Sequence, residues 1–103
     1  MVRVIKKMPL REFWEQWPAA EQPLTFWYRL ALRGRWRTFA DVKTTFGQAD
    51  LAKVKSGNTV VVFDIGGNKF RLIAKISYEK QKVYVLRVLT HKEYDGNLWK
   101  EQL

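Results

Sequence analysis

The residues best suited to chemistry stand close together near the C-terminus. The segment from Thr90 to Asp95 contains the one histidine of the chain, His91, with Tyr94 three residues later and two acidic side chains nearby. An imidazole titrates near neutral pH, so it can take up and release a proton under physiological conditions. If the segment forms a helical turn, residues three apart lie on one side of it. His91 and Tyr94 are therefore candidates for proton transfer.

Basic side chains precede this segment. From Phe70 to Tyr78 apolar residues alternate with more polar ones, a pattern typical of a strand with one apolar face. Lys69, Arg71 and Lys75 are separated by even numbers of residues and so share the other face. Such a row can follow a phosphate backbone. Taken alone, a solvated edge strand protected by charge explains the row equally well.

Together these side chains meet the requirements for cutting RNA internally. The reaction needs a base for the 2′-hydroxyl, a cation for the charge on the phosphorane and an acid for the leaving oxygen. Histidine, arginine, lysine and tyrosine can supply all three. A single histidine with scattered carboxylates lacks the ligand spacing of a metal site. We therefore expect no metal and no other cofactor.

The composition fits a small basic domain. The 103 residues are enough for one hydrophobic core, so we expect a single domain over residues 1–103. Nineteen Lys and Arg against ten Asp and Glu give a net charge of +9, spread over both halves of the chain, which favours a nucleic-acid partner. The chain has no cysteine, no apolar stretch long enough for a membrane span and no signal-peptide pattern. These features predict a cytoplasmic protein without membrane contact.

The first half of the chain has helical periodicity. A short strand is expected at residues 3–5, and a first helix ends at Pro18. A second helix begins near Glu21 and stops near Gly34, and a third runs from the N-cap Thr38 to about Phe46. The apolar positions of the first two helices follow the spacing of a buried stripe. They are Leu10, Phe13, Trp14 and Trp17, then Leu24, Trp27, Tyr28 and Ala31.

The second half is rich in strand-forming residues. Strands are expected at residues 59–65, 70–78 and 83–89, with a strong turn signal at residues 66–68. Residues 47–58 are interpreted as a loop, with a short helical piece at 49–54 as the alternative. The resulting order is β-α-α-α-β-β-β. It predicts an α+β fold with the helices packed on one face of a mostly antiparallel sheet.

Two further points concern individual residues. Packing is the favoured role of all five tryptophans. Trp36 is the most credible candidate for base stacking, but packing is preferred there as well. Trp99 is expected to anchor the C-terminal tail. The register of the last two strands stays open between two hairpins. A two-residue loop at 80–81 places Arg71 opposite Thr90, whereas a three-residue loop at 80–82 places it opposite His91.

Several segments together resemble a known family. Residues 62–72 and 90–95 are similar to the two signature segments of HigB toxins, which belong to the RelE superfamily. Residues 39–46 and the segment from Trp14 to Tyr28 are similar to the helical half of that family. The resemblance covers nearly the whole chain. It implies a RelE-like fold, cleavage of mRNA on the ribosome, and neutralisation by a helix-turn-helix antitoxin of the HigA type in a type II toxin–antitoxin system.

The resemblance also implies roles for individual residues. By match to the signature segments, Arg71 stabilises the transition-state charge, while His91 and Tyr94 transfer protons. The implied RNA-binding residues are Lys43, Lys69, Lys75 and Lys92. Asp95 either orients His91 or caps a helix, and Asn68 is a turn residue. Two alternatives remain: a basic module that binds RNA without cutting it, and a catalytically inactive homologue that only binds its antitoxin.

Overall fold

A five-stranded sheet runs through the molecule in the computed structural model, which describes residues 2–5 and 8–103. The strand order is β1-β5-β4-β3-β2; β1 runs parallel to β5, and the other neighbours are antiparallel. This confirms the expected α+β class with a mostly antiparallel sheet. The strands are β1 (Arg3–Ile5), β2 (Asp50–Lys53), β3 (Thr59–Ile65), β4 (Phe70–Ser77) and β5 (Lys82–Thr90).

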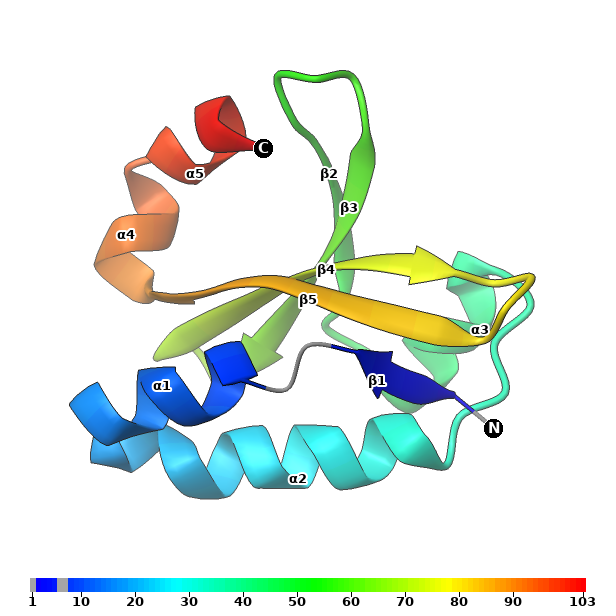
Figure 1. Cartoon of the computed structure of the whole chain (residues 1–103), viewed down its shortest axis with the longest axis horizontal. Helices are drawn as coiled ribbons and strands as arrows, with labels where there is room; N and C mark the ends of the chain where they lie inside the picture. The colour runs from blue at the N-terminus through cyan, green and yellow to red at the C-terminus, as the bar shows by residue number, and fades with distance from the viewer. Residues whose placement is uncertain (1, 6–7) are drawn as a thin grey trace.

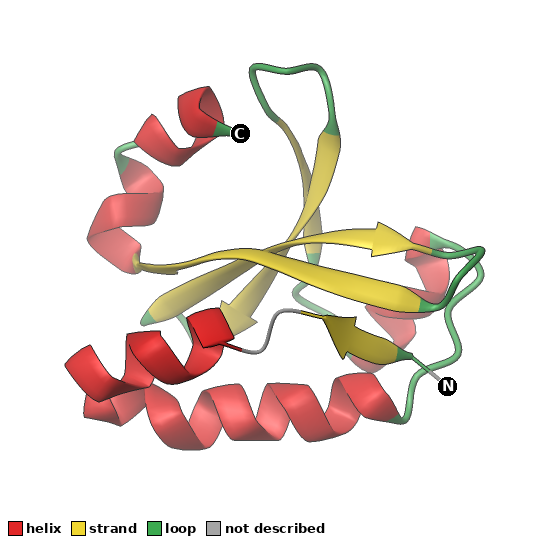
Figure 2. Ribbon diagram, in the orientation of Figure 1, coloured by secondary structure: helices red, strands yellow, loops and turns green. Residues whose placement is uncertain are grey.

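Helices lie on both sides of this sheet (Figures 1 and 2). One group precedes β2 and comprises α1 (Met8–Gln16), the 3₁₀ turn η1 (Pro18–Ala20), α2 (Glu21–Leu32) and α3 (Phe39–Thr45). A second group follows β5 and comprises α4 (His91–Asp95) and α5 (Leu98–Gln102). The expectation of helices on a single face was therefore incomplete.

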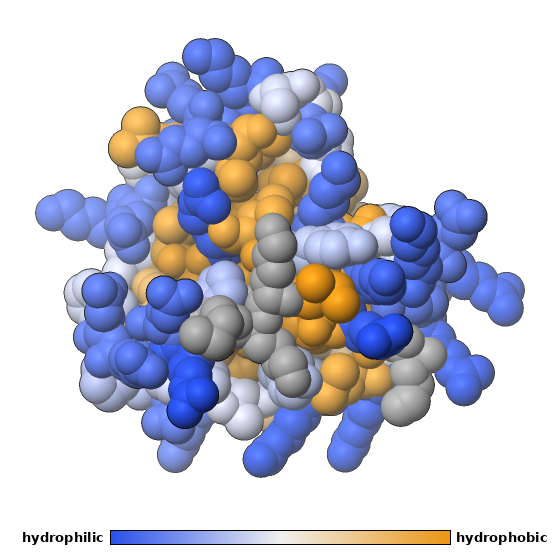
Figure 3. Space-filling model, viewed as in Figure 1, coloured by the Kyte–Doolittle hydropathy of each residue, from blue (hydrophilic) through white to orange (hydrophobic). Residues whose placement is uncertain are grey.

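Two separate cores explain why both faces need a cover. The larger core packs α1 and α2 against one face and includes Leu24, Trp27, Phe63 and Leu72. The smaller core lies on the other face. Its buried residues are Val54, Val60, Val62, Ile73, Leu89 and Trp99. Trp99 is 2% exposed and anchors the tail as predicted, because it closes this second core. Figure 3 shows apolar surface between the C-terminal helices and the β2–β3 hairpin, bordered by hydrophilic residues.

The expected loop at residues 47–58 contains β2, which the sequence analysis missed. The segment Asp50–Lys53 has no β-branched or aromatic residue, so its composition does not favour a strand. It pairs with β3 in register, with Asp50 opposite Val62 and Lys53 opposite Thr59. Backbone pairing to a strongly β-forming neighbour outweighs the weak local preference, and the helical alternative is wrong.

The β4–β5 register differs from both predicted hairpins. Ser77 pairs with Lys82, so four residues form the loop, and a bulge between Ile73 and Ala74 shifts the register by one. Arg71 consequently lies opposite Leu89, and neither Thr90 nor His91 faces it. The left-handed backbone of Gln81 (φ 54°) allows this loop.

Trp17 and Trp36 differ in their exposure to solvent. Trp17 was expected on a buried stripe but is 47% exposed, because α1 ends at Gln16 and Pro18 begins a new turn. Trp36 is 1% exposed, and its indole N–H donates to Thr45 Oγ1 at 3.2 Å. Packing, the preferred role of Trp36, is confirmed, and the ring is not available for base stacking.

Candidate active site

Arg71 is fixed in place by its neighbours on β3 and the β3–β4 turn. Its side chain lies on the smaller-core face, and the residue is 7% exposed. Asp64 is its direct partner across the two strands, and Arg71 Nε lies 3.2 Å from Asp64 Oδ1. Nη1 donates to the carbonyl oxygen of Phe70 at 3.1 Å, and Nη2 donates to Asn68 Oδ1. The strand register and the turn thus hold the guanidinium in one orientation.

Tyr94 brings α4 against this guanidinium. Arg71 Cζ lies 5.1 Å from the centre of the Tyr94 ring, a cation–π distance. The other neighbour of that ring is Trp99, stacked at 5.5 Å with an interplanar angle of 17°. Lys100 Nζ lies 5.5 Å from the Trp99 ring, and the Trp99 indole N–H donates to the Tyr94 carbonyl at 3.0 Å. Tyr94 is therefore held between a cation and an anchored ring.

His91 begins the short helix that carries Tyr94. Thr90 caps α4 in a capping box: the Glu93 N–H donates to Thr90 Oγ1, and the Thr90 N–H donates to the Glu93 carboxylate. The His91 N–H donates to the Lys69 carbonyl at 3.0 Å, which ties α4 to the start of β4. His91 Nε2 lies 3.1 Å from Asp95 Oδ2, with both side chains about half exposed. His91 and Tyr94 thus share one helical turn but have different partners. His91 contacts Asp95, and Tyr94 contacts Arg71.

Comparison with known proteins places this cluster in a defined family. Residues 20–97 match the family HigB_toxin, described as the RelE-like toxic component of a toxin–antitoxin system. The chain belongs to the HigB toxin family. The matched range contains Asp64, Arg71, His91 and Tyr94, so the cluster lies within the part that defines membership.

Several HigB proteins are similar to this chain over most of its length. The mRNA interferase toxin HigB of Escherichia coli (strain K12) is 30% identical over 94 residues, which are 91% of this chain and 88% of that protein. The mRNA interferase HigB of Shigella flexneri gives the same values. That of Escherichia coli O6:H1 is also 30% identical, over 91% of this chain and 89% of its own.

The predicted RNA-binding lysines are exposed but do not form one row. Lys75 is on the same face of β4 as Arg71, with the fully buried Ile73 between them. Lys69 lies in the turn before β4, Lys92 on α4, and Lys43 on α3. The predicted open basic face of β4 is therefore interrupted, because α4 and α5 cover the part that contains Arg71 and Ile73.

Sequence reasoning missed three residues of this HigB-family site. Asp64 binds Arg71, and Asn68, predicted only as a turn residue, also accepts a hydrogen bond from it. Arg87 is opposite Ile73 next to the bulge, so it adds a partly buried cation to this face of the sheet. A carboxylate in the otherwise apolar strand of residues 59–65 was the available signal for Asp64, because a charge in a strand core needs a partner.

The described part of the chain offers neither a metal-ligand cluster nor a membrane-spanning helix. Across residues 2–5 and 8–103, no three His, Cys, Asp or Glu side chains gather in a cluster that could ligate a metal ion. Within the same ranges, every helix is too short or too polar to cross a membrane.

Proposed function

We propose that this HigB-family chain is an mRNA interferase and that Arg71, Tyr94 and His91 form its catalytic set. Family membership and the relatives named mRNA interferase support the activity. The contact of the Arg71 guanidinium with the Tyr94 ring supports the site, because it joins a phosphate-binding group to a phenol in one fixed geometry. The proposed setting is the cytoplasm, with mRNA on the ribosome as the substrate.

The proposed reaction begins with attack of a ribose 2′-oxygen on the adjacent phosphorus. The O2′–P bond forms and the P–O5′ bond breaks, which leaves a 2′,3′-cyclic phosphate on one fragment and a 5′-hydroxyl on the other. One proton leaves O2′ and one is delivered to O5′, so the overall step is balanced without an oxidant or a reductant. It requires a base, an acid and stabilisation of the phosphorane charge.

The contacts of His91 and Tyr94 suggest a division of these roles. If the Nε2–H of His91 donates to Asp95, the other ring nitrogen, Nδ1, carries the free lone pair and can accept the O2′ proton. Tyr94, a phenol beside a guanidinium, then supplies the proton for O5′. Asp95 acts as a positioning residue for the imidazole.

The contacts of Arg71 suit a preorganised donor. The three hydrogen-bonded or ion-paired contacts recorded within the described residues use three of the five guanidinium N–H donors, so two are left for a phosphate oxygen. The Asp64 carboxylate offsets part of the positive charge of Arg71. The main contribution of Arg71 is therefore the fixed direction of its N–H donors rather than its net charge. Long-range attraction of RNA comes from the net charge of +9, to which the exposed lysines Lys43, Lys69, Lys75 and Lys92 contribute.

One observation favours a second candidate. Arg71 is buried and paired with Asp64, as in an ion pair that serves only stability. A chain of that kind would bind RNA or its antitoxin without cutting, and Tyr94 would be a packing residue.

The experiment that separates the two is cleavage of mRNA by the purified protein, alone and with translating ribosomes. We expect new fragments with 5′-hydroxyl and cyclic-phosphate ends. Where RNA is cut without ribosomes, cleavage should continue in the presence of a chelator. Intact RNA under both conditions, with RNA binding retained, would establish the non-catalytic candidate. Co-expression with a helix-turn-helix antitoxin of the HigA type should restore growth of cells that the toxin arrests.

A further inference from the structure

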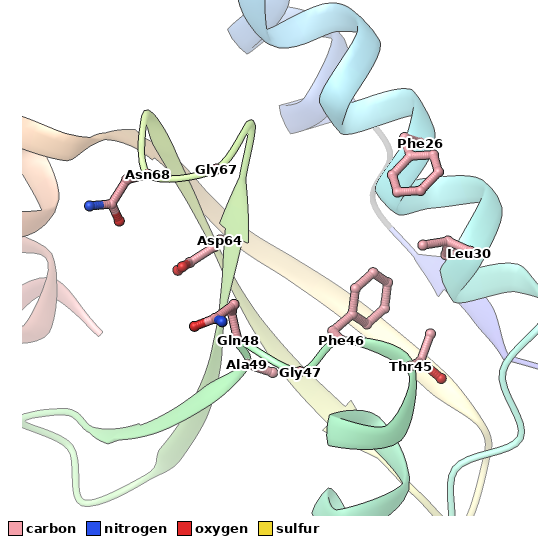
Figure 4. Close-up of a pocket in the computed structure, with 10 residues that line it drawn as sticks. All are labelled: Phe26, Leu30, Thr45, Phe46, Gly47, Gln48, Ala49, Asp64, Gly67 and Asn68. Atoms are coloured by element: carbon pink, nitrogen blue, oxygen red, sulfur yellow. The ribbon is translucent and has the colours of Figure 1, made fainter.

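An open hollow lies on the side of Asp64 that faces α2, away from the Tyr94 stack. It measures about 600 Å³ and is formed by α2, the loop after α3 and the β3–β4 turn. Phe26 and Leu30 extend from α2 toward Phe46, so this half is apolar (Figure 4). The other half is polar and contains Gln48, Asp64 and Asn68. Two of the residues that hold Arg71 therefore line the hollow.

Large apolar side chains are exposed in and near the apolar half of the hollow. Phe26 is 64% exposed, and Leu51 on the neighbouring edge strand β2 is 46% exposed. A smaller compartment of about 260 Å³ shares Phe26 and Phe46 with the hollow and is lined also by Trp27. Exposed aromatic surface at a depression is typical of a binding site.

The charges indicate which class of occupant fits. Among the residues that the structure describes, Asp64 is the one charged residue that lines either compartment, and none of them offers a cation there to a phosphate. Arg29 and Glu21 line a groove on α2 that also contains Phe26, and Arg33 is exposed at the end of the same helix, which leaves a net positive charge at this margin. An apolar floor with arginines at its margin suits a protein segment with a hydrophobic anchor and acidic neighbours better than it suits RNA.

We propose that this hollow is the docking site of the antitoxin. An aliphatic or aromatic side chain of the antitoxin fills the space between Phe26, Leu30 and Phe46, and acidic residues next to it face Arg29. The inference rests on the neutralisation by an antitoxin proposed above. It places the bound partner beside Asp64 and Asn68, next to the catalytic arginine but on the opposite side from Tyr94.

The test compares two equal charge changes at exposed apolar residues. Phe26→Glu places a carboxylate in the hollow, and the matched control Leu98→Glu places one on α5, where Leu98 is 62% exposed. The probe is the purified product of the reading frame that neutralises the toxin on co-expression. Calorimetry gives its affinity for each variant, and thermal denaturation verifies folding. We expect Phe26→Glu to weaken binding at least about 30-fold, as for an interface hot spot, and Leu98→Glu to change it less than about threefold.

Other results would distinguish an error in the docking site from an error in the proposed enzymatic activity. Equal affinity of Phe26→Glu and the unmodified chain would overturn the docking site, while the neutralisation itself would stand. Loss of RNA cleavage in folded Phe26→Glu with antitoxin affinity retained would also overturn it, because the hollow would then bind a nucleobase. Absence of cleavage by the unmodified chain would contradict the proposed enzymatic activity without bearing on the hollow.

A second measurement does not depend on affinity. The chain has no cysteine, so Gln48→Cys provides a unique attachment point for a photoreactive maleimide in the hollow. We expect irradiation of the labelled complex to cross-link the antitoxin from Gln48→Cys and not from the control Leu98→Cys. Efficient cross-linking from Leu98→Cys alone would place the antitoxin on the C-terminal helices and contradict the proposal.

Discussion

The Arg71 guanidinium lies 5.1 Å from the centre of the Tyr94 ring, so a residue in the middle of the sheet contacts a helix that follows the last strand. The capped turn at Thr90 begins α4 directly after β5, and α4 then lies against β4. The predictions below test whether the contact is part of a reaction centre or only of the fold.

Arg71→Ala should destabilise the protein, because the Arg71 side chain is buried and paired with Asp64. The variant leaves the partly buried Asp64 carboxylate without its cation and removes a packed side chain. Loss of one partner from a buried pair costs about 3–5 kcal/mol, and the 27% exposure of Asp64 reduces this to about 1–3 kcal/mol. Urea denaturation measures this change in the free energy of unfolding. The double variant with Asp64→Ala should recover part of the loss; purely additive effects would mean that the pair is not coupled.

Trp99 should act as a positioning residue for Tyr94. Trp99→Phe keeps an aromatic ring beside Tyr94 but removes the indole donor to the Tyr94 carbonyl, a change worth about 1 kcal/mol. We expect a slower maximal cleavage rate with the RNA concentration for half-maximal rate unchanged. Trp17→Phe, at an exposed tryptophan, is the control and should alter neither quantity. A higher half-saturation concentration with an unchanged maximal rate would assign Trp99 to RNA binding.

The pair of His91 and Asp95 predicts a graded effect. His91→Ala removes the proposed base and should slow cleavage by about 10²–10⁴-fold. Asp95→Asn leaves the imidazole in place and removes only its charged partner, so the loss should be smaller. Both side chains are exposed, so stability should change by less than about 0.5 kcal/mol. Normal cleavage by His91→Ala at every pH would exclude His91 from the catalytic set.

Tyr78 should affect stability only at alkaline pH. Burial raises the pKa of its phenol above the ordinary value of 10.0. Above about pH 10 the unfolded chain loses this proton first, so the folded chain binds more protons and the free energy of unfolding decreases as pH rises. Tyr78→Phe removes this contribution. Denaturation at about pH 8 and about pH 11 should show a smaller alkaline loss in the variant, and an equal loss would refute the assignment.

The sequence predicted the parts of this fold that depend on local patterns. The apolar stripe of α2, the capping box at Thr38 and the β-branched strand β3 all follow from residues close together in the chain. The strand β2 and the β4–β5 register depend instead on pairing between segments, and no local signal determines them. A four-residue loop, offset by one residue at the bulge, places Arg71 opposite Leu89 rather than Thr90 or His91.

The candidate site was predictable in residue types but not in contacts. Arg71 and Tyr94 were chosen from their types and positions, and they do lie together. The sequence could not show that Arg71 is buried, because its cover comes from α4 and α5, two short helices after the last predicted strand. Asp64 was missed for a related reason: its role exists only through its cross-strand partner.

The most direct test of the account is the cleavage rate of Tyr94→Phe beside that of Tyr84→Phe. Both variants lose only a hydroxyl; Tyr94→Phe keeps the ring stacked between Arg71 and Trp99, and Tyr84 lies elsewhere on the sheet, opposite Lys75. If the Tyr94 hydroxyl transfers a proton, folded Tyr94→Phe binds mRNA normally but cuts it about 10²-fold more slowly or worse. Tyr84→Phe should cut at nearly the normal rate. Cleavage by Tyr94→Phe at the normal rate would contradict the account, because Tyr94 would then serve only to pack against Arg71.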